Sequence, residues 1–393
     1  MKAGELVIEE RLQLFALYSN HLSRACHFCL EETANAKRCS ECKYAHYCSH
    51  EHQMADWKNG HKKECKIFKT MTGEGKKQPT APLAIILKAF VQLEMMSNLG
   101  LKKNIEALKG HDDAMTPERH DELRDNVILV FKYSDGNFDL ERIEHYVKIL
   151  DRILINGVTV YSKSDAGDSL AMGLLKDFSR TNHSCEPNCF SAYNNLSMRI
   201  VTARPIQPGE EITFSYVDSL DRVENRRKKL KTEYFFDCSC AKCKRELESP
   251  APKCPLTAEE LNTQLETIED CRKYVKLLET KLAPNDYEWY RGLERIEPVL
   301  ASLRELEYLY EFRLRFTSKF EHWFGDCTLN PVVGQHYNNL GRLANQLGLV
   351  QETYTYCTKA IQIFKPYFTG PLMKELEEMA TDAKSYLEMH MKS

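Results

Sequence analysis

The sequence predicts an α+β protein: an irregular β core, interrupted by a metal-binding finger and a helical insert, followed by an α-helical C-terminal domain. Three observations lead to this class. Cysteines and histidines are concentrated between residues 26 and 65. Strand-like segments with Pro-Gly turns begin near residue 156. After Pro255 the chain consists of long helical stretches with few glycines.

Length, charge and hydropathy narrow the class of protein. The 393 residues are enough for two or three domains, each with its own core. The net charge of −3 and the pI near 6.5 give no sign of a whole-surface attraction to nucleic acid or anionic membrane. No apolar run is long enough to span a membrane, and "MKAGELVIEE" lacks the layout of a signal peptide. We therefore expect a soluble protein of the cytoplasm or nucleus, where the fifteen cysteines favour metal ligation over disulfides.

The first cysteine cluster lies within residues 24–69 and is built from four ligand pairs. The pairs are Cys26-x2-Cys29, Cys39-x2-Cys42, Cys48-x3-His52 and His61-x3-Cys65. Eight ligands saturate two tetrahedral zinc sites. A segment this short and polar could hardly fold by apolar burial alone, so we expect metal binding to supply its folding free energy. His50 lies two residues from His52 and is an alternative ligand.

A linker and two helices are predicted within residues 70–155. "TMTGEGKKQPTAP" is rich in Gly, Thr, Lys and Pro, which indicates a flexible, exposed linker. "LAIILKAFVQLEMM" and "DLERIEHYVKILDRILI" repeat apolar residues every three or four positions, which predicts amphipathic helices. From "NGVTVYS" the apolar period shortens towards two, and "NNLSMRIVTARPI" and "GEEITFSYVD" predict strands within residues 156–220.

The second cysteine cluster, within residues 221–250, is one ligand short of a closed site. Cys238-x-Cys240-x2-Cys243 offers three thiolates, whereas a structural zinc ion takes four ligands. Cys185, in "NHSCEPNC", is the best candidate for the fourth, and this bridge would hold Asn182 and His183 beneath "YFFDC". The basic run "RRKKLKTEY" is typical of a solvated helix face, with steering of an acidic partner as the alternative. The remaining cysteines are expected to be core or surface thiols: Cys189, Cys254, Cys271, Cys327 and Cys357.

The C-terminal region, residues 255–393, contains one clear repeat unit. "NNLGRLANQLGLVQETYTYCTKAIQIF" places Leu340, Gly341, Gly348 and Ala360 at the small and apolar positions of a tetratricopeptide helix pair. Solenoids need several such units to bury a continuous core, so we expect a tetratricopeptide-like domain with degenerate neighbours from about 256 to 328. Such a domain either forms a peptide-binding groove or simply packs on the core.

These motifs, taken together, resemble one known family. The ligand pairs in the frame "YC…ADWK…HKKEC" resemble the MYND zinc finger. "NHSCEPN", "GEEITFSY" and "CSCAKC" resemble the SET core and post-SET motif of protein lysine methyltransferases. In this order they are similar to the SET and MYND domain-containing (SMYD) family along almost the whole chain. The resemblance implies a SET domain built from residues 1–23 and 156–220, with the MYND finger and helical SET insert between them and a post-SET zinc segment after them.

The resemblance also implies three structural zinc ions and their ligands. In MYND fingers the pairs interleave. One ion would take Cys26, Cys29, Cys48 and His52; the second Cys39, Cys42, His61 and Cys65; and the third Cys185, Cys238, Cys240 and Cys243. MYND fingers bind proline-rich peptides and some contact DNA, so partners of these kinds are expected, while the chain shows no sign of a membrane partner.

The implied activity is methyl transfer from S-adenosylmethionine to histone or non-histone lysines. Tyr216 matches the tyrosine whose hydroxyl orients the lysine amine, and Tyr234 matches a wall of the aromatic lysine channel. Such a channel desolvates the entering lysine, which lowers its pKa and restricts its approach. The implied cofactor-binding residues are Asn182 and His183, Phe236, which matches the aromatic residue that stacks on the adenine, and Asn156.

The chain departs from the family pattern at several positions. Family members begin with a strand carrying a Gly-x-Gly turn that lets the backbone approach the cofactor, whereas Met1 stands directly before "KAGELVIEE", so we expect this first strand to be missing. His52 replaces a usual cysteine, Val158 replaces a usual aromatic residue, and Arg180 and Thr181 replace apolar residues. These departures favour an alternative function: a zinc-finger adaptor of weak or no catalytic activity that binds proteins through its MYND and helical C-terminal domains.

Overall fold

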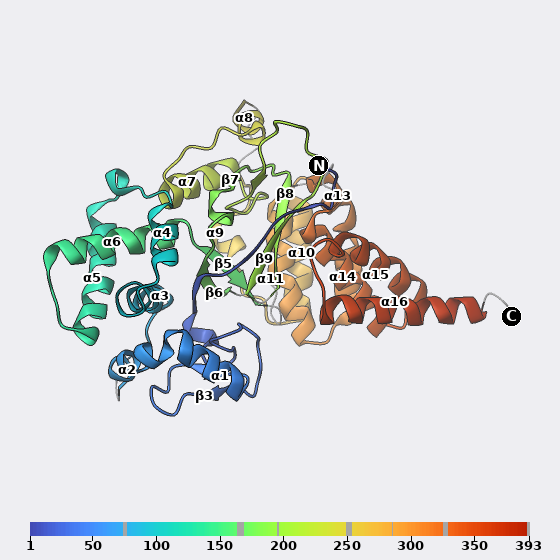
Figure 1. Ribbon diagram of the computed structural model, residues 1–393. Helices are drawn as coiled ribbons and strands as arrows, with labels where there is room; N and C mark the ends of the chain where they lie inside the picture. The colour runs from blue at the N-terminus through green and yellow to red at the C-terminus, as the bar shows by residue number, and fades with distance from the viewer. Residues whose placement is uncertain are drawn as a thin grey trace.

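The computed structural model describes residues 1–73, 77–162, 169–194, 196–248, 254–284, 286–324 and 329–390. Small β sheets occupy the centre, a helical insert lies on one side of them, and the C-terminal helices lie on the other (Figure 1). The α+β class, with an irregular β core and a helical C-terminal region, is therefore confirmed. Cys327 lies outside the described residues.

The β core is assembled from strands that are distant in the sequence. Its strands are β1 (Leu6–Arg11), β2 (Leu14–Leu17), β5 (Val158–Tyr161), β6 (Ser169–Leu174), β7 (Asn182–His183), β8 (Cys189–Asn194), β9 (Ser197–Thr202) and β10 (Thr213–Phe214). The two larger sheets are antiparallel, with orders β1-β9-β8 and β2-β6-β5, and β10 pairs in parallel with β7. "KAGELVIEE" thus belongs to the β core, because Leu6 lies opposite Val201.

The inserted module and the helical insert follow β2. The module contains β3 (Lys37–Arg38), β4 (His46–Tyr47), α1 (His50–Asp56) and α2 (Lys62–Met71); the insert contains α3 (Ala81–Phe90), α4 (Leu99–Glu106), α5 (Pro117–Ser134) and α6 (Leu140–Ile155). Both expected amphipathic helices are present, as α3 and α6, and the first continues into a π-helical turn at Val91–Met95. Each begins at a side-chain cap, since Thr80 accepts from the Leu83 amide and Asp139 from the Arg142 amide. The helices shorten the expected linker at both ends, because α2 extends to Met71 and α3 begins at Ala81. Residues 74–76 lie outside the described residues.

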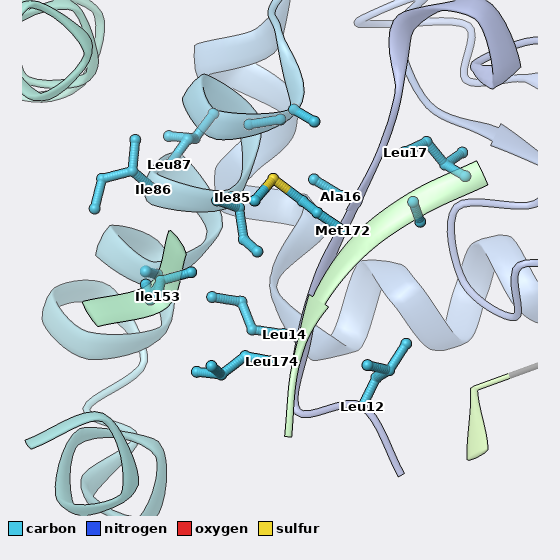
Figure 2. Packing of buried hydrophobic residues seen from close by; sticks show 14 of the residues in the cluster. Leu12, Leu14, Ala16, Leu17, Ile85, Ile86, Leu87, Ile153, Met172 and Leu174 are labelled. Carbon is cyan, nitrogen blue, oxygen red and sulfur yellow. The ribbon is translucent and has the colours of Figure 1, made fainter. Parts of the chain in front are cut away.

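The main hydrophobic core joins this insert to the sheet β2-β6-β5. Figure 2 shows Ile85 of α3 next to Met172 of β6 and Leu14 of β2, with Ile86 and Leu87 on the side of α3 farther from the sheet. The three α3 residues are completely buried, so this helix is covered on nearly all sides, as expected for a helix that is apolar all round. The sheet and the insert therefore share one hydrophobic core.

The C-terminal helices have a core of their own. They are α9 (Ala258–Leu261), α10 (Ile268–Lys281), α11 (Glu288–Ser302), α12 (Leu306–Leu314), α13 (Thr317–Phe324), α14 (Pro331–Gln346), α15 (Val350–Phe364) and α16 (Pro371–His390). The helix pair with the tetratricopeptide pattern is α14 and α15, and they pack so closely that a Cβ on Gly341 would lie 2.7 Å from the Cys357 sulfur. Among the described residues, no helix is both long and apolar enough to cross a membrane.

The C-terminal domain meets the β core along two surfaces. Tyr367, which is buried, packs against Ala192 of β8 and Val201 of β9. A polar contact lies on the other side, where Arg222 is 3.3 Å from Asp286. The segment after β10 is thereby held between the β core and the C-terminal helices.

Candidate active site and metal sites

Two groups of four ligand atoms lie in the inserted module. In each group all four atoms lie within 4.8 Å of one another: Cys26, Cys29, Cys48 and His52 in one, and Cys39, Cys42, His61 and Cys65 in the other. The sulfur atoms of Cys29 and Cys48 are 3.8 Å apart, as are those of Cys39 and Cys65. Ligands about 2.3 Å from a central zinc ion would be about 3.8 Å apart in a tetrahedron, so both groups have the size of a zinc site.

Local structure explains why His52 rather than His50 joins the first group. The Ser49 hydroxyl accepts from the His52 amide and starts α1 directly after Cys48. His52 is then one helical turn from Cys48, with its Nδ1 atom 2.9 Å from the Cys48 sulfur, whereas His50 is exposed. In the second group, the Nδ1 atom of His61 faces Asp56 and Glu64, and such carboxylates commonly orient a ligating histidine.

The third group joins two distant parts of the chain. Cys185 lies with Cys238, Cys240 and Cys243, all four sulfur atoms lie within 4.8 Å of one another, and the Cys185 and Cys243 sulfurs are 3.5 Å apart. A hydrogen bond from Cys185 lowers the pKa of Cys240 to about 3, while the same contact and burial raise the pKa of Cys185. Thiols this close cannot all ionise without a cation between them, which is the chemistry of a metal site.

Sequence reasoning did not find the arginine beside the third group. Arg226 belongs to α7 (Val223–Tyr234), whose basic run is typical of a solvated helix face. Its side chain is only 1% exposed, because α8 (Ala241–Glu248) covers it. One guanidinium nitrogen lies 2.6 Å from a Glu246 oxygen and 3.7 Å from the Cys243 sulfur. The sequence held one chemical indication of such an arginine: four thiolates on a divalent ion leave an excess of negative charge, which a buried cation would balance.

An aromatic cluster adjoins this group, and it contains the two residues expected to be catalytic. The ring of Tyr216 lies 4.9 Å from that of Tyr234, 5.0 Å from that of Phe214 and 6.4 Å from that of Phe236. All four rings are partly exposed. The Tyr216 hydroxyl donates to the Thr181 carbonyl at 2.7 Å. Burial and the neighbouring Tyr234 raise the pKa of Tyr216 to about 12, so this phenol stays protonated at neutral pH.

Asn182 and His183 lie beside the same cluster. They form β7, and the His183 ring is 5.2 Å from that of Tyr216 and 5.9 Å from that of Phe236. The Tyr216 amide donates to the Nδ1 atom of His183 at 2.9 Å. Asn182 is exposed and donates to Glu211 at 2.6 Å. The structure therefore brings together His183, Tyr216, Tyr234 and Phe236, and Asn182 precedes His183 in β7.

Asn156 is held differently from the other expected cofactor residues. It ends α6, and its amide group donates to the carbonyls of Lys109 and Arg152 at 2.8 and 2.9 Å. Its own carbonyl accepts from the Ser179 hydroxyl, which ties it to the loop before β7. The Asn156 side chain thus links the end of α6 to the loop at Lys109, and the Asn156 backbone carbonyl links it to Ser179.

Two further polar residues fasten the loops around the cluster. Asn188, in "EPN", is buried: it accepts from the Thr213 amide of β10 and donates to the carbonyl of Glu211, which precedes β10. Sequence reasoning missed it. Thr181 is buried and supplies the acceptor for Tyr216, whereas Arg180 is exposed.

The remaining positions of interest lie in the core. Val158 pairs with Gly173 and packs on the main core. Of the cysteines expected to be free thiols, Cys254 is partly buried and three are buried: Cys189, Cys271 and Cys357.

Comparisons with known proteins identify the family of this chain. The model of the SET domain family matches residues 2–217. The histone-lysine N-methyltransferase Smyd1 of Mus musculus is 24% identical over 98% of this chain and 86% of its own length. The histone-lysine N-methyltransferase SMYD3 of Homo sapiens is 23% identical over 94% of this chain and 80% of its own length. The SET domain and MYND-type zinc finger protein 6 of Schizosaccharomyces pombe (strain 972 / ATCC 24843) is 30% identical over 62% of this chain and 48% of its own length.

Proposed function

The chain belongs to the SET domain family, in its SET and MYND domain-containing branch, and on this basis we propose that it transfers a methyl group from S-adenosylmethionine to lysines of protein substrates. One observation carries the proposal. The segment "NHSC" places Cys185 in the third ligand group and, two residues earlier, His183 against Tyr216 of the aromatic cluster. A lysine methyltransferase needs these two elements side by side, since one shapes the walls of the site and the other aligns the amine.

The aromatic cluster is suited to preparing a lysine amine. S-adenosylmethionine supplies a methyl group on a positively charged sulfur, and the amine that takes it must be neutral. Tyr216 and Tyr234 replace water around the entering side chain, which lowers the pKa of the lysine. Because the Tyr216 hydroxyl donates its proton to the Thr181 carbonyl, its oxygen remains free to accept an N–H of the amine and fix its direction.

The three ligand groups fit structural zinc ions. Each group supplies four protein ligands, so no coordination position is left for a substrate or a catalytic water. The first two ions would fold the module within residues 24–69, and the third would fasten the post-SET segment within 221–250 over β7. The substrates would be histone or non-histone lysines, and the module would bind proline-rich peptides with weak contact to DNA. We propose the nucleus or the cytoplasm as its location.

Calorimetry on the full zinc-loaded chain tests the proposal. We expect S-adenosylmethionine to bind, binding to be lost in Asn182→Ala, and binding to be kept in Asn126→Ala, a partly exposed asparagine of α5. Transfer of labelled methyl groups to a mixture of histone and lysine-rich peptides then identifies substrates. If a folded chain with three zinc ions bound no cofactor, the adaptor function would replace this proposal. Two observations favour the adaptor function: Val158 stands in place of an aromatic residue, and the Asn156 amide already donates to the Lys109 carbonyl.

Metal analysis tests the zinc assignment separately. Cys185→Ala should reduce the zinc content from three ions to two per chain, because a three-ligand site binds zinc less tightly. Cys189→Ala is the matched control, since Cys189 is equally buried and lies outside the three groups. Equal zinc contents in the two variants would contradict the assignment.

A further inference from the structure

The ring of His183 contacts the third ligand group at one nitrogen and the strand end that carries Tyr216 at the other. The Nε2 atom lies 3.2 Å from the Cys185 sulfur. The Nδ1 atom lies 2.9 Å from the backbone nitrogen of Tyr216. These are different ring edges, so one side chain spans the two elements.

Chemistry fixes the proton position on this ring. A backbone N–H only donates, so the Nδ1 atom facing Tyr216 must be an acceptor without a proton. The neutral ring then carries its proton on Nε2, which faces the Cys185 sulfur. A metal-bound cysteine is a thiolate, and its sulfur accepts hydrogen bonds. The two contacts therefore require the same tautomer.

We infer that His183 is a positioning residue that couples the third metal site to Tyr216: its Nε2–H donates to the Cys185 thiolate, and its Nδ1 holds the Tyr216 amide. The coupling to catalysis rests on the proposed function, because it presumes that Tyr216 aligns the substrate. The link between ring and metal site does not depend on that function. The Tyr216 side chain is fastened independently, through its hydroxyl bond to the Thr181 carbonyl.

Substituting His183 with asparagine or with glutamine removes one of its two contacts at a time. Asparagine places an acceptor oxygen where Nδ1 stands, so His183→Asn keeps the bond from the Tyr216 amide and loses the donor to Cys185. Glutamine places an N–H group where Nε2 stands, so His183→Gln keeps the donor to sulfur and loses the acceptor. Loss of a hydrogen bond to a metal ligand typically lowers metal affinity about 10- to 100-fold.

Chelator challenge of the full chain reads out the metal half. We expect His183→Asn to release one of three zinc ions about 10- to 100-fold more readily than the wild type, with the other two unaffected. His183→Gln and His322→Asn, an exposed histidine of α13, should retain zinc as the wild type does. Equal zinc loss in both His183 variants would overturn the inference, because it would indicate general loss of packing.

Steady-state kinetics read out the Tyr216 half. His183→Gln should lower kcat about 10- to 100-fold through misalignment of Tyr216, with a KM for the protein substrate close to that of the wild type. His183→Asn, measured with its third zinc ion present, should lower kcat less than His183→Gln does. The reverse ranking of the two variants would overturn the coupling to Tyr216.

Nuclear magnetic resonance of the zinc-loaded chain with ¹⁵N-labelled histidine observes the tautomer directly. The His183 signals are those absent from the spectrum of His183→Asn. We expect a neutral ring with its proton on Nε2; a proton on Nδ1 at neutral pH would overturn the inference. A chain that bound no cofactor would instead overturn the proposed function, and the tautomer and zinc-release results would still decide the role of His183.

Discussion

Replacing Arg226 with methionine should weaken the third metal site far more than the same change at its neighbour Arg227. The two residues are adjacent in α7 but have opposite surroundings. The Arg226 side chain is 1% exposed and bonded to Glu246 at 2.6 Å, whereas Arg227 is 30% exposed and its partner Asp237 lies 3.5 Å away at the surface. Methionine keeps much of the apolar length of arginine and removes its charge and donors.

The magnitude follows from what the substitution leaves behind. Breaking a buried ion pair by removing one partner typically costs about 3–5 kcal/mol. Glu246 is 35% exposed and is therefore partly rehydrated. The Asp221 carbonyl, however, loses its guanidinium donor, and the charge of four thiolates is no longer balanced. We expect a loss of about 2–4 kcal/mol, which corresponds to about 30- to 700-fold weaker binding of the third zinc ion.

Zinc release is the appropriate assay, because a chain of several domains has no single free energy of unfolding. The full chain is titrated with a competing chelator while released zinc is followed with an absorbing indicator. Arg226→Met should release one of three ions early, Arg226→Lys should recover part of the affinity, and Arg227→Met should behave as the wild type. If Arg226→Met and Arg227→Met release zinc alike, the reasoning on charge balance is wrong.

Three further predictions concern the aromatic cluster and the C-terminal helices. Tyr216→Phe should keep three zinc ions and cofactor binding but lower kcat about 100-fold, because the amine loses its aligning oxygen; unchanged turnover would exclude the assigned role. Burial, aided by Arg313, lowers the pKa of His336 to about 3, so as the pH falls below 6.5 the unfolded chain takes up a proton that the folded one refuses, and stability is progressively lost down to about pH 3. Between pH 7.5 and 5.5 the part of this loss due to His336 should be about 1.4 kcal/mol, measured as the difference between the wild type and His336→Gln in the tryptophan-monitored urea unfolding of the C-terminal helices. Gly341→Ala should destabilise the C-terminal domain by about 1–3 kcal/mol in thermal unfolding, because its Cβ would lie 2.7 Å from the Cys357 sulfur; a raised melting temperature would show that helix propensity outweighs this crowding.

The ligand residues and the long helices were accessible from the sequence because their signals are local. Four consecutive Cys/His pairs predicted two complete sites, and a three-cysteine cluster predicted a distant fourth ligand, which led to Cys185. The structure gathers the same twelve side chains into three groups. Apolar residues every three or four positions likewise predicted α3 and α6.

The environment of single polar side chains was not accessible in this way. Arg226 and Arg227 are chemically identical in the sequence, and only the packing of α8 on α7 buries one of them. Asn156 is a candidate for a cofactor contact by resemblance, and only the structure shows that its amide donates to the Lys109 carbonyl in the helical insert. No sequence pattern singled out Asn188, whose side-chain oxygen accepts from the Thr213 amide of β10.

The sequence by itself determined which side chains of this protein can bind metal and that α3, α6 and the C-terminal region are helical, because ligand chemistry and apolar periodicity belong to neighbouring residues. Only the tertiary structure decided which nitrogen of His183 carries the proton. That choice depends on a backbone amide at Tyr216 and a sulfur at Cys185, and no local pattern specifies how two parts of a chain will face the same ring.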